Sequence, residues 1–299
     1  MRVSIKQSFF FLLLLAGFLL SVGHTACASP TLRVEIFPRA VKQGDLCLVR
    51  VWGPASCESI CGEFRGEKVL MDPGTHAGTY EGLVGIDMGI RPGAYEFKVT
   101  ASERENRVHS TSISINVEKV DFGIQRLSLP SSLVDLDTRT LERVRKEADR
   151  LERLFKGFRN ERLWSGAFLR PVQGEVTGAF GLRRMINGRA RSPHSGIDIQ
   201  AEKGTPVLAT NNGVAVLVDQ LFFSGKSVIL DHGAGLYSVY FHLSEILAKE
   251  GEKVLKGAPI GRVGSTGRST APHLHWGVRI TEARVDPRSL LALTGPLAE

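Results

Sequence analysis

Two short stretches in the C-terminal half of the chain combine residue types that can bind a metal. His194 and Asp198 form an HxxxD pattern, and His273 and His275 form an HxH pattern. Zinc in proteins prefers such ligands, and a catalytic zinc site takes three of them and leaves the fourth position open. Either stretch alone is weak evidence, because isolated histidines are common. If the two stretches meet in space, the sequence predicts a hydrolytic metal site.

The segments that must position these residues have the pattern of strands. Asp198 lies in Gly-Ile-Asp-Ile, and His273 opens the run His-Leu-His-Trp-Gly-Val-Arg-Ile, in which polar and apolar positions alternate. Side chains two residues apart on a strand share a face. We therefore expect His273 and His275 to point the same way.

A third strand-like run, 236–243, carries another histidine, His242. Strict alternation along this run puts Tyr240 on the same face as His242, and we expect Tyr240 to line the cleft. A half-buried strand tyrosine without a functional role is the alternative interpretation.

Taken together, the motifs resemble the lysostaphin-type (LytM-like) zinc endopeptidases, an exported family that cuts peptide bonds in bacterial peptidoglycan. The resemblance covers about residues 165–292. It rests on the HxxxD pattern, on Tyr-x-His-Leu at 240–243, and on a Gly/Ser/Thr-rich loop at 264–272 that leads into His-Leu-His. Ala271 and Trp276 depart from the residues that the family often has there, but neither change removes a ligand.

Carried over by position, the resemblance implies that one zinc ion per chain is bound by His194, Asp198 and His275. It also implies that His242 and His273 are the catalytic histidines. Zinc lowers the pKa of a bound water and polarises the substrate carbonyl. A histidine supplies a general base near neutral pH. Which of the two histidines is the base is left open.

The function implied by the resemblance is that of an exported zinc metalloendopeptidase that hydrolyses peptide cross-links of peptidoglycan during cell-wall remodelling. Two alternatives stay open. Some relatives have lost the metal ligands and act as non-catalytic activators of a cell-wall amidase, but all five histidine and aspartate residues are present here. Other relatives cut envelope or extracellular proteins. The motifs do not determine which bond is cut.

Four arginines crowd the segment just before His194: Arg183, Arg184, Arg189 and Arg191. We expect them to contact the carboxylates of peptidoglycan stem peptides or cross-bridges at the rim of the cleft. A solvated basic loop is the alternative.

The N-terminus has the pattern of a secretory signal peptide over residues 1–28. Basic residues precede an apolar run at 9–20, and the small residues 26–28 follow it. The run is shorter than the roughly 20 apolar residues of a membrane span, so no transmembrane span is expected after cleavage. The expected location is the periplasm or cell envelope. A lipoprotein modified at Cys27 is the less favoured alternative.

The chain is basic, with 38 Lys and Arg against 31 Asp and Glu and a formal net charge of +7. Loss of the signal peptide would remove two of these positive charges. A modestly basic exported protein suits an anionic wall polymer, and the export signal argues against nucleic acid. Cys47, Cys57 and Cys61 remain, and in an oxidising compartment they predict one disulfide of any of the three pairings.

The overall prediction is a mostly β chain in three parts after the signal peptide. Residues 29–120 are expected to form an Ig-like β-sandwich, because short alternating segments recur between turns. Its expected strands are 32–37, 47–52, 78–84, 94–100 and 110–117. An envelope protein partner that binds this N-terminal domain is a further candidate.

The linker and the catalytic domain complete the chain. Residues 121–164 form a linker with an amphipathic helix over 138–155, capped by Asp137 or Thr138. Residues 165–299 are the zinc peptidase domain, an antiparallel β-sheet with the zinc in a groove across one sheet. Its expected strands are 174–179, 205–209, 213–218, 227–230 and 277–280.

Overall fold

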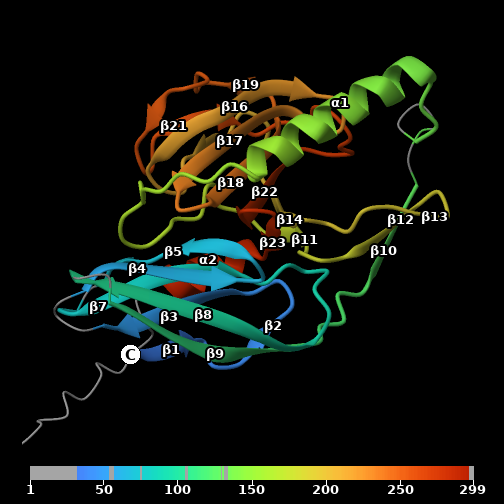
Figure 1. Ribbon diagram of the computed structural model, residues 1–299. Coiled ribbons are helices and arrows are strands. Elements are labelled where there is room, and N and C mark those ends of the chain that lie inside the picture. Colours follow the sequence, from blue (N-terminus) through green and yellow to red (C-terminus); the bar gives the residue numbers. More distant parts are fainter. Residues whose placement is uncertain are drawn as a thin grey trace, which may run out of the picture.

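The computed structural model describes residues 32–53, 57–74, 76–104, 107–128, 130 and 134–295. The expected signal peptide at 1–28 and Cys27 lie outside the described residues. Within them the chain is built mainly of strands and carries two helices, so the prediction of a mostly β fold is confirmed. Neither of these helices combines the length and apolar character needed to cross a membrane. Figure 1 shows the arrangement.

The N-terminal part is a sandwich of two sheets. One sheet has the order β1 (Arg33–Phe37), β3 (Leu46–Trp52), β7 (Thr79–Gly85) and β6 (Asp72–Pro73). The other has the order β2 (Val41–Lys42), β9 (Val108–Glu118), β8 (Gly93–Glu103), β4 (Cys57–Phe64) and β5 (Glu67–Leu70). Alternate residues of both sheets, such as Val49 and Phe97, fill one buried core between them.

Strand β4 was absent from the expected strands, and Gly62 explains why. Ile60, Gly62 and Phe64 all point into the core, but the glycine interrupts the apolar alternation that identifies a strand. A Cβ atom at Gly62 would lie 2.6 Å from the Phe97 ring. The two sheets pack so closely that this position requires a glycine. The same glycine makes the strand difficult to recognise in the sequence.

The expected disulfide is not formed, because the three described cysteines are free. Cys57 and Cys61 are four residues apart on β4, which separates their Cα atoms by about 13 Å, far beyond the roughly 7 Å limit of a disulfide. Cys47 lies in the opposite sheet, fully buried, and its thiol donates to the Val84 carbonyl at 3.5 Å. Burial raises the pKa of the Cys47 thiol to about 12.

Helix α1 (Thr138–Phe155) has the predicted bounds. Asp137 caps its N-terminus, with the carboxylate accepting a hydrogen bond from the Thr140 amide at 2.7 Å. Its C-terminal residues Leu151, Leu154 and Phe155 pack in a separate apolar cluster against the sheet of the catalytic domain. In Figure 1 the helix crosses in front of that sheet.

The C-terminal part is organised around one antiparallel sheet. Its order is β11 (Val176–Gly178), β14 (Gly196–Gln200), β22 (His273–Ile280), β18 (Leu236–Leu243), β17 (Gly225–Gly233), β16 (Gly213–Leu221) and β20 (Lys253–Val254), with β23 (Ala283–Val285) paired to β22. A smaller sheet joins β15 (Pro206–Leu208), β21 (Pro259–Arg262) and β19 (Glu245–Ile246). Buried apolar residues from the two sheets, among them Val207 and Leu230, form the core.

A third small sheet ties the linker to the catalytic domain. Strand β10 (Ile124–Leu127) from the linker pairs with β12 (Arg183–Ile186), which pairs in turn with β13 (Arg189–Ala190). Helix α2 (Pro287–Thr294), capped by Asp286, ends the described chain. The linker is thus part of the folded structure at two places, at β10 and at α1.

Candidate metal centre and groove

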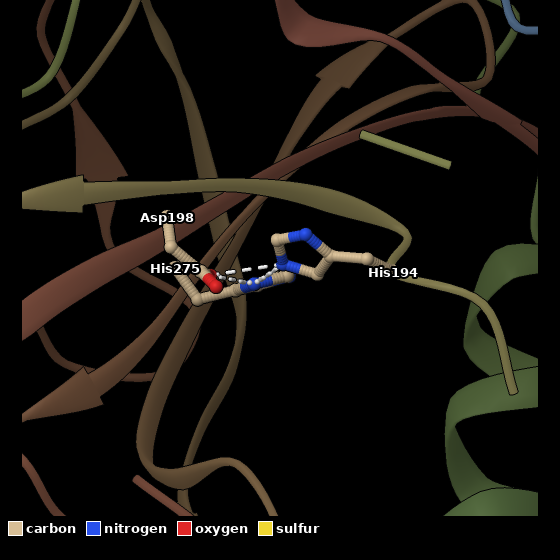
Figure 2. Close-up of side chains that lie close together, drawn as sticks. All are labelled: His194, Asp198 and His275. Atoms are coloured by element: carbon tan, nitrogen blue, oxygen red, sulfur yellow. Dashed lines mark hydrogen bonds and ion pairs between the residues drawn. The ribbon is translucent and has the colours of Figure 1, made fainter. Parts of the chain in front are cut away.

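The register between β14 and β22 assembles the metal centre. Asp198 lies directly opposite His275 in this antiparallel pair. His194 approaches from the segment just before β14, and its amide donates to the Leu182 carbonyl at 2.9 Å, which fixes that segment. Figure 2 shows the three side chains pointing at one another.

Three donor atoms converge at this point. Asp198 Oδ1 lies 2.9 Å from His194 Nε2 and 2.8 Å from His275 Nδ1, and the two ring nitrogens are 2.9 Å apart. Zinc ligands at about 2.0–2.1 Å in a tetrahedron lie roughly 3.3 Å from one another, so a slight outward movement of these atoms suits zinc. The His194 and His275 side chains are almost completely buried.

The proton on His194 is placed by its second ring nitrogen. Nδ1 donates to the Ala179 carbonyl at 2.8 Å, which leaves Nε2 with a lone pair facing Asp198. Such an outer contact fixes the tautomer of a metal-binding histidine. The donor set, two neutral ring nitrogens and one carboxylate oxygen, is one that zinc binds.

The electrostatics of the centre favour a carboxylate and neutral rings. Burial opposes the charge on Asp198, but the adjacent His194 and His275 rings outweigh it and hold the pKa of Asp198 far below its usual range. Burial lowers the pKa of His275 to about 4 against the raising effect of Asp198. Arg184 lies 3.4 Å from the second carboxylate oxygen of Asp198, which it helps to orient.

The two histidines expected to be catalytic lie beside these donors. The His242 and His273 rings are 4.9 Å apart, centre to centre. His242 Nδ1 donates to the Thr266 carbonyl and His273 Nδ1 to the Ala271 carbonyl, each at 2.8 Å. In the neutral form of both rings Nε2 therefore carries a lone pair. In His273 this nitrogen lies 3.7 Å from Asp198 Oδ1. Burial lowers the pKa of His242 to about 3.

The expectation that Tyr240 lines the cleft is wrong. Phe241 lies opposite His275 across the β18–β22 pair, and their rings stack at 5.4 Å. The side chain of Tyr240, the residue before Phe241 on the strand, therefore points to the other side of the sheet. Tyr240 is fully buried there, with its hydroxyl bound to the Thr210 amide. The His242 backbone has a left-handed conformation, with φ of 64°. This conformation breaks the alternation of side chains along β18, so the His242 side chain lies on the side of the metal centre.

The four arginines before His194 have different surroundings. Arg183 pairs with Asp121 at 3.5 Å and Arg189 with Asp135 at 2.6 Å, both linker residues. Arg184 contacts Asp198 and also donates to Gln125 of β10 at 3.2 Å. Arg191 is half-buried, and its Nε has no hydrogen-bond partner among the described residues.

Helix α1 covers the face of the sheet that carries the metal centre. Tyr237, Val239 and Phe241 alternate along β18 on the same face as His275. Leu151 and Phe155 of α1 belong to the apolar cluster that these β18 side chains form. The Phe155 and Tyr237 rings meet edge to face at 5.5 Å. The amphipathic pattern predicted the helix, but nothing in the sequence indicated the surface that it covers.

One further histidine, His232, lies on the far side of the sheet from the metal centre. It is fully buried between the Asn212 carbonyl at 2.6 Å and the Ser238 hydroxyl at 2.7 Å. Burial lowers its pKa to about 4. It is a neutral, hydrogen-bonded core residue.

Comparison with known proteins identifies the domain. Residues 192–287 match peptidase family M23. The chain is 36% identical over 132 residues to the peptidoglycan DD-endopeptidase ShyA of Vibrio cholerae, covering 44% of this chain and 28% of ShyA. It is 37% identical over 136 residues to the DD-carboxypeptidase/endopeptidase Mpg of Neisseria meningitidis, covering 41% of this chain and 31% of Mpg. The chain thus spans less than a third of the length of either relative.

A solved structure matches more of the chain. The crystal structure of a Pseudomonas aeruginosa protein assigned to peptidase M23 superposes with a TM-score of 0.67 at 27% identity and covers 84% of this chain and 95% of that one. The match therefore reaches beyond the C-terminal sheet. The ordered motifs, the converging donors and these matches agree that residues 192–287 of this chain form a peptidase M23 domain.

Proposed function

We propose that this chain is an exported zinc metalloendopeptidase that hydrolyses peptide cross-links of peptidoglycan in the cell envelope. The observation that carries the proposal is the convergence of His194 Nε2, Asp198 Oδ1 and His275 Nδ1 within 2.9 Å of one another. A structural zinc site takes four protein ligands, whereas three leave a position for substrate. Three ligands are what the described residues offer at this point.

The chemistry divides between the metal and the two free histidines. When bound, zinc polarises the scissile carbonyl and makes a water nucleophilic near neutral pH. In the neutral rings of His242 and His273, Nδ1 donates to a backbone carbonyl, which leaves Nε2 with a lone pair. One of the two histidines accepts the proton of the attacking water and, protonated in this way, donates a hydrogen bond to the developing oxyanion before it passes the proton to the leaving amine. The carbonyls of Thr266 and Ala271 hold both rings in the required tautomer.

The substrate class is supported by the relatives and by the charge around the centre. ShyA is named as a peptidoglycan DD-endopeptidase, and Mpg is named as a DD-carboxypeptidase/endopeptidase. Burial lowers the pKa of Arg268, and the charges of the nearby Arg184 and Arg191 lower it further. Positive charge is therefore concentrated beside the metal centre. Such a potential attracts the carboxylates of stem peptides. Arg183 and Arg189 would reach them only by leaving their linker partners.

Digestion of purified sacculi, followed by mass spectrometry of the soluble fragments, tests the proposal. We expect cross-linked dimers to be converted to monomers by the wild-type chain, and no conversion by Asp198→Ala or after chelation. Fragments that appear only when an amidase is added would show an activator instead. Cleavage of envelope proteins with intact cross-links would redirect the proposal to a protein substrate.

A further inference from the structure

A large cavity opens beside the metal centre. It has a volume of about 990 Å³ and lies between the sandwich, helix α1 and the face of the catalytic sheet that carries His275. Ser195, next to His194, and Phe241, stacked on His275, line its near end. The cavity therefore extends the site along β22, toward the sandwich.

Arg279 lies on the floor of this cavity. It follows His273 and His275 on β22 with the alternation that keeps all three on one face of the sheet. Four residues of strand separate the Cα atoms of His275 and Arg279 by about 13 Å. Arg279 pairs across the sheet with Tyr237, so the surrounding sheet fixes its position.

The guanidinium of Arg279 has few partners for a half-buried cation. Its Cζ lies 4.3 Å above the Phe155 ring, and Nη1 donates to the Glu282 carbonyl at 3.3 Å. Among the described residues no carboxylate pairs with it. The neighbouring Arg284, in contrast, binds the Asp87 carboxylate through two side-chain hydrogen bonds. Burial, followed by the charge of Arg284, lowers the pKa of Arg279 to about 10.

The charges of the nearby Asp87 and Glu282 carboxylates raise the pKa of Arg279, but neither carboxylate forms an ion pair with it. Three of the four carboxylates of the lining are already engaged, Asp87 with Arg284, and Glu152 and Glu282 with Lys156. The fourth, Glu67, is exposed on the edge strand β5 of the sandwich. On the sandwich side the lining adds the basic residues Arg65, Lys68 and Arg91. A partly desolvated charge without a counter-ion is costly. The cavity thus offers its most buried positive charge to an anionic ligand.

We infer that Arg279 binds a carboxylate of the peptide substrate and selects peptides that carry a free acid at this distance from the bond to be cut. The inference rests on the proposed function. An extended peptide spans at most about 3.3–3.6 Å per residue, so the carboxylate lies roughly three to four residues from the scissile bond. The planar guanidinium matches a carboxylate through two parallel hydrogen bonds. Arg279 is a specificity residue and takes no part in the proton transfers.

The test uses two soluble cross-linked peptides that differ only in whether the carboxyl group at this position is free or amidated. We expect wild-type kcat/KM to favour the free acid by about 10- to 100-fold, the scale of a charge-assisted hydrogen bond. Arg279→Gln should lose this preference through a higher KM for the free acid, with kcat on the amidated peptide within twofold of wild type. Arg279→Lys should keep part of the preference.

The controls separate this inference from folding and from the proposed function. Arg262→Gln removes an exposed cation of the same domain outside the cavity and should leave the preference intact. Calorimetric titration of both peptides into chelator-treated protein measures selectivity without turnover, so the proposed function can fail while Arg279 still discriminates. Equal affinity of the wild-type chain for the two peptides, or equal losses on both in Arg279→Gln, would overturn the inference.

Discussion

At the residue scale, the metal centre depends most on Asp198, whose Oδ1 is the atom shared by both histidine contacts. Asp198→Ala leaves two protein ligands, which rarely hold zinc tightly. We expect the purified variant to contain little zinc by elemental analysis, against about one ion per wild-type chain. A full complement of zinc in the variant would remove Asp198 from the ligand set.

The two free histidines are expected to behave differently from the ligands. His242→Ala and His273→Ala remove rings that lie beside the centre without being among its three converging donors. Both variants should keep zinc and the fold but lose hydrolysis by about 10²-fold or more, the scale of general acid–base catalysis. Wild-type turnover in either variant, with zinc content matched, would exclude that histidine from catalysis.

Gly178 of the neighbouring strand β11 has no side chain, which leaves room for the Asp198 carboxylate. A Cβ atom there would lie 2.4 Å from Asp198 Oδ2, so Gly178→Ala must push the carboxylate away. We expect zinc affinity to fall by about 10–100-fold, as for other residues that support metal ligands. Competition with a chelator measures it. Val176→Ala on the same strand is the control, and equal affinities in the two variants would contradict the argument.

Residue spacing predicted which groups would meet, but it could not predict every orientation. The HxxxD and HxH patterns place His194, Asp198 and His275 at one point because antiparallel pairing aligns their strands. Tyr240 was misplaced because the prediction assumed strict alternation up to His242. The positive φ of His242 breaks that alternation, and a histidine gives no sequence signal of such a conformation.

At the scale of the elements, helix α1 packs on the face of the sheet that carries the metal centre. Arg150 of α1 pairs with Asp219 at 2.5 Å, and Leu154 packs against the cluster on the face of the sheet that carries His275. Substrate that follows the sheet competes with this packing. A few kcal/mol of helix docking is enough to shift such an equilibrium.

We therefore expect the double variant Arg150→Ala/Leu154→Ala to cleave peptide substrates severalfold faster than the wild-type chain, measured at matched zinc content. Leu141→Ala, which changes an exposed residue of the same helix, is the control and should leave the rate unchanged. Equal or lower activity of the double variant would show that α1 is a scaffold for the groove and does not restrict access to it.

The sequence predicted elements well where a single pattern governs them. The helical period and the Asp137 cap define α1 to the residue. Strand β10 was not expected, because four residues with no strong alternation form a strand only when β12 supplies the pairing partner. The face that α1 covers likewise depends on partners more than 60 residues away in the chain, which local periodicity does not encode.

At the scale of the whole molecule, the sandwich and the catalytic domain form one packed unit. Leu46 and Met88 of the sandwich are buried in the core of the catalytic domain. The Leu46 amide donates to the Ser289 hydroxyl of α2 at 2.8 Å. A Cβ atom at Gly85 would lie 2.8 Å from Ile280, so the two parts approach closely. Sequence periodicity predicted both parts, but it carries no information on how the two surfaces meet.

The ion pair between Asp87 and Arg284 gives this interface a pH dependence. Burial raises the pKa of Asp87, but the hydrogen bonds from Arg284 and the Gly89 amide outweigh it and hold the pKa below its ordinary value. A carboxyl group whose pKa is lower in the folded state contributes stability above its unfolded pKa of about 3.9. That contribution is lost as the pH falls through the lower folded value.

We expect Asp87→Asn to reduce the free energy of unfolding by about 1 kcal/mol at pH 7, a modest value because the pair is partly exposed to solvent. Acid also releases metal from histidine ligands, so wild type and variant are compared at each pH after chelation. Denaturant titration should show the difference between them shrinking below about pH 4. Asp121→Asn, at an exposed linker residue, is the control. A difference that persists unchanged at pH 3 would mean that the charge of Asp87 does not stabilise the interface.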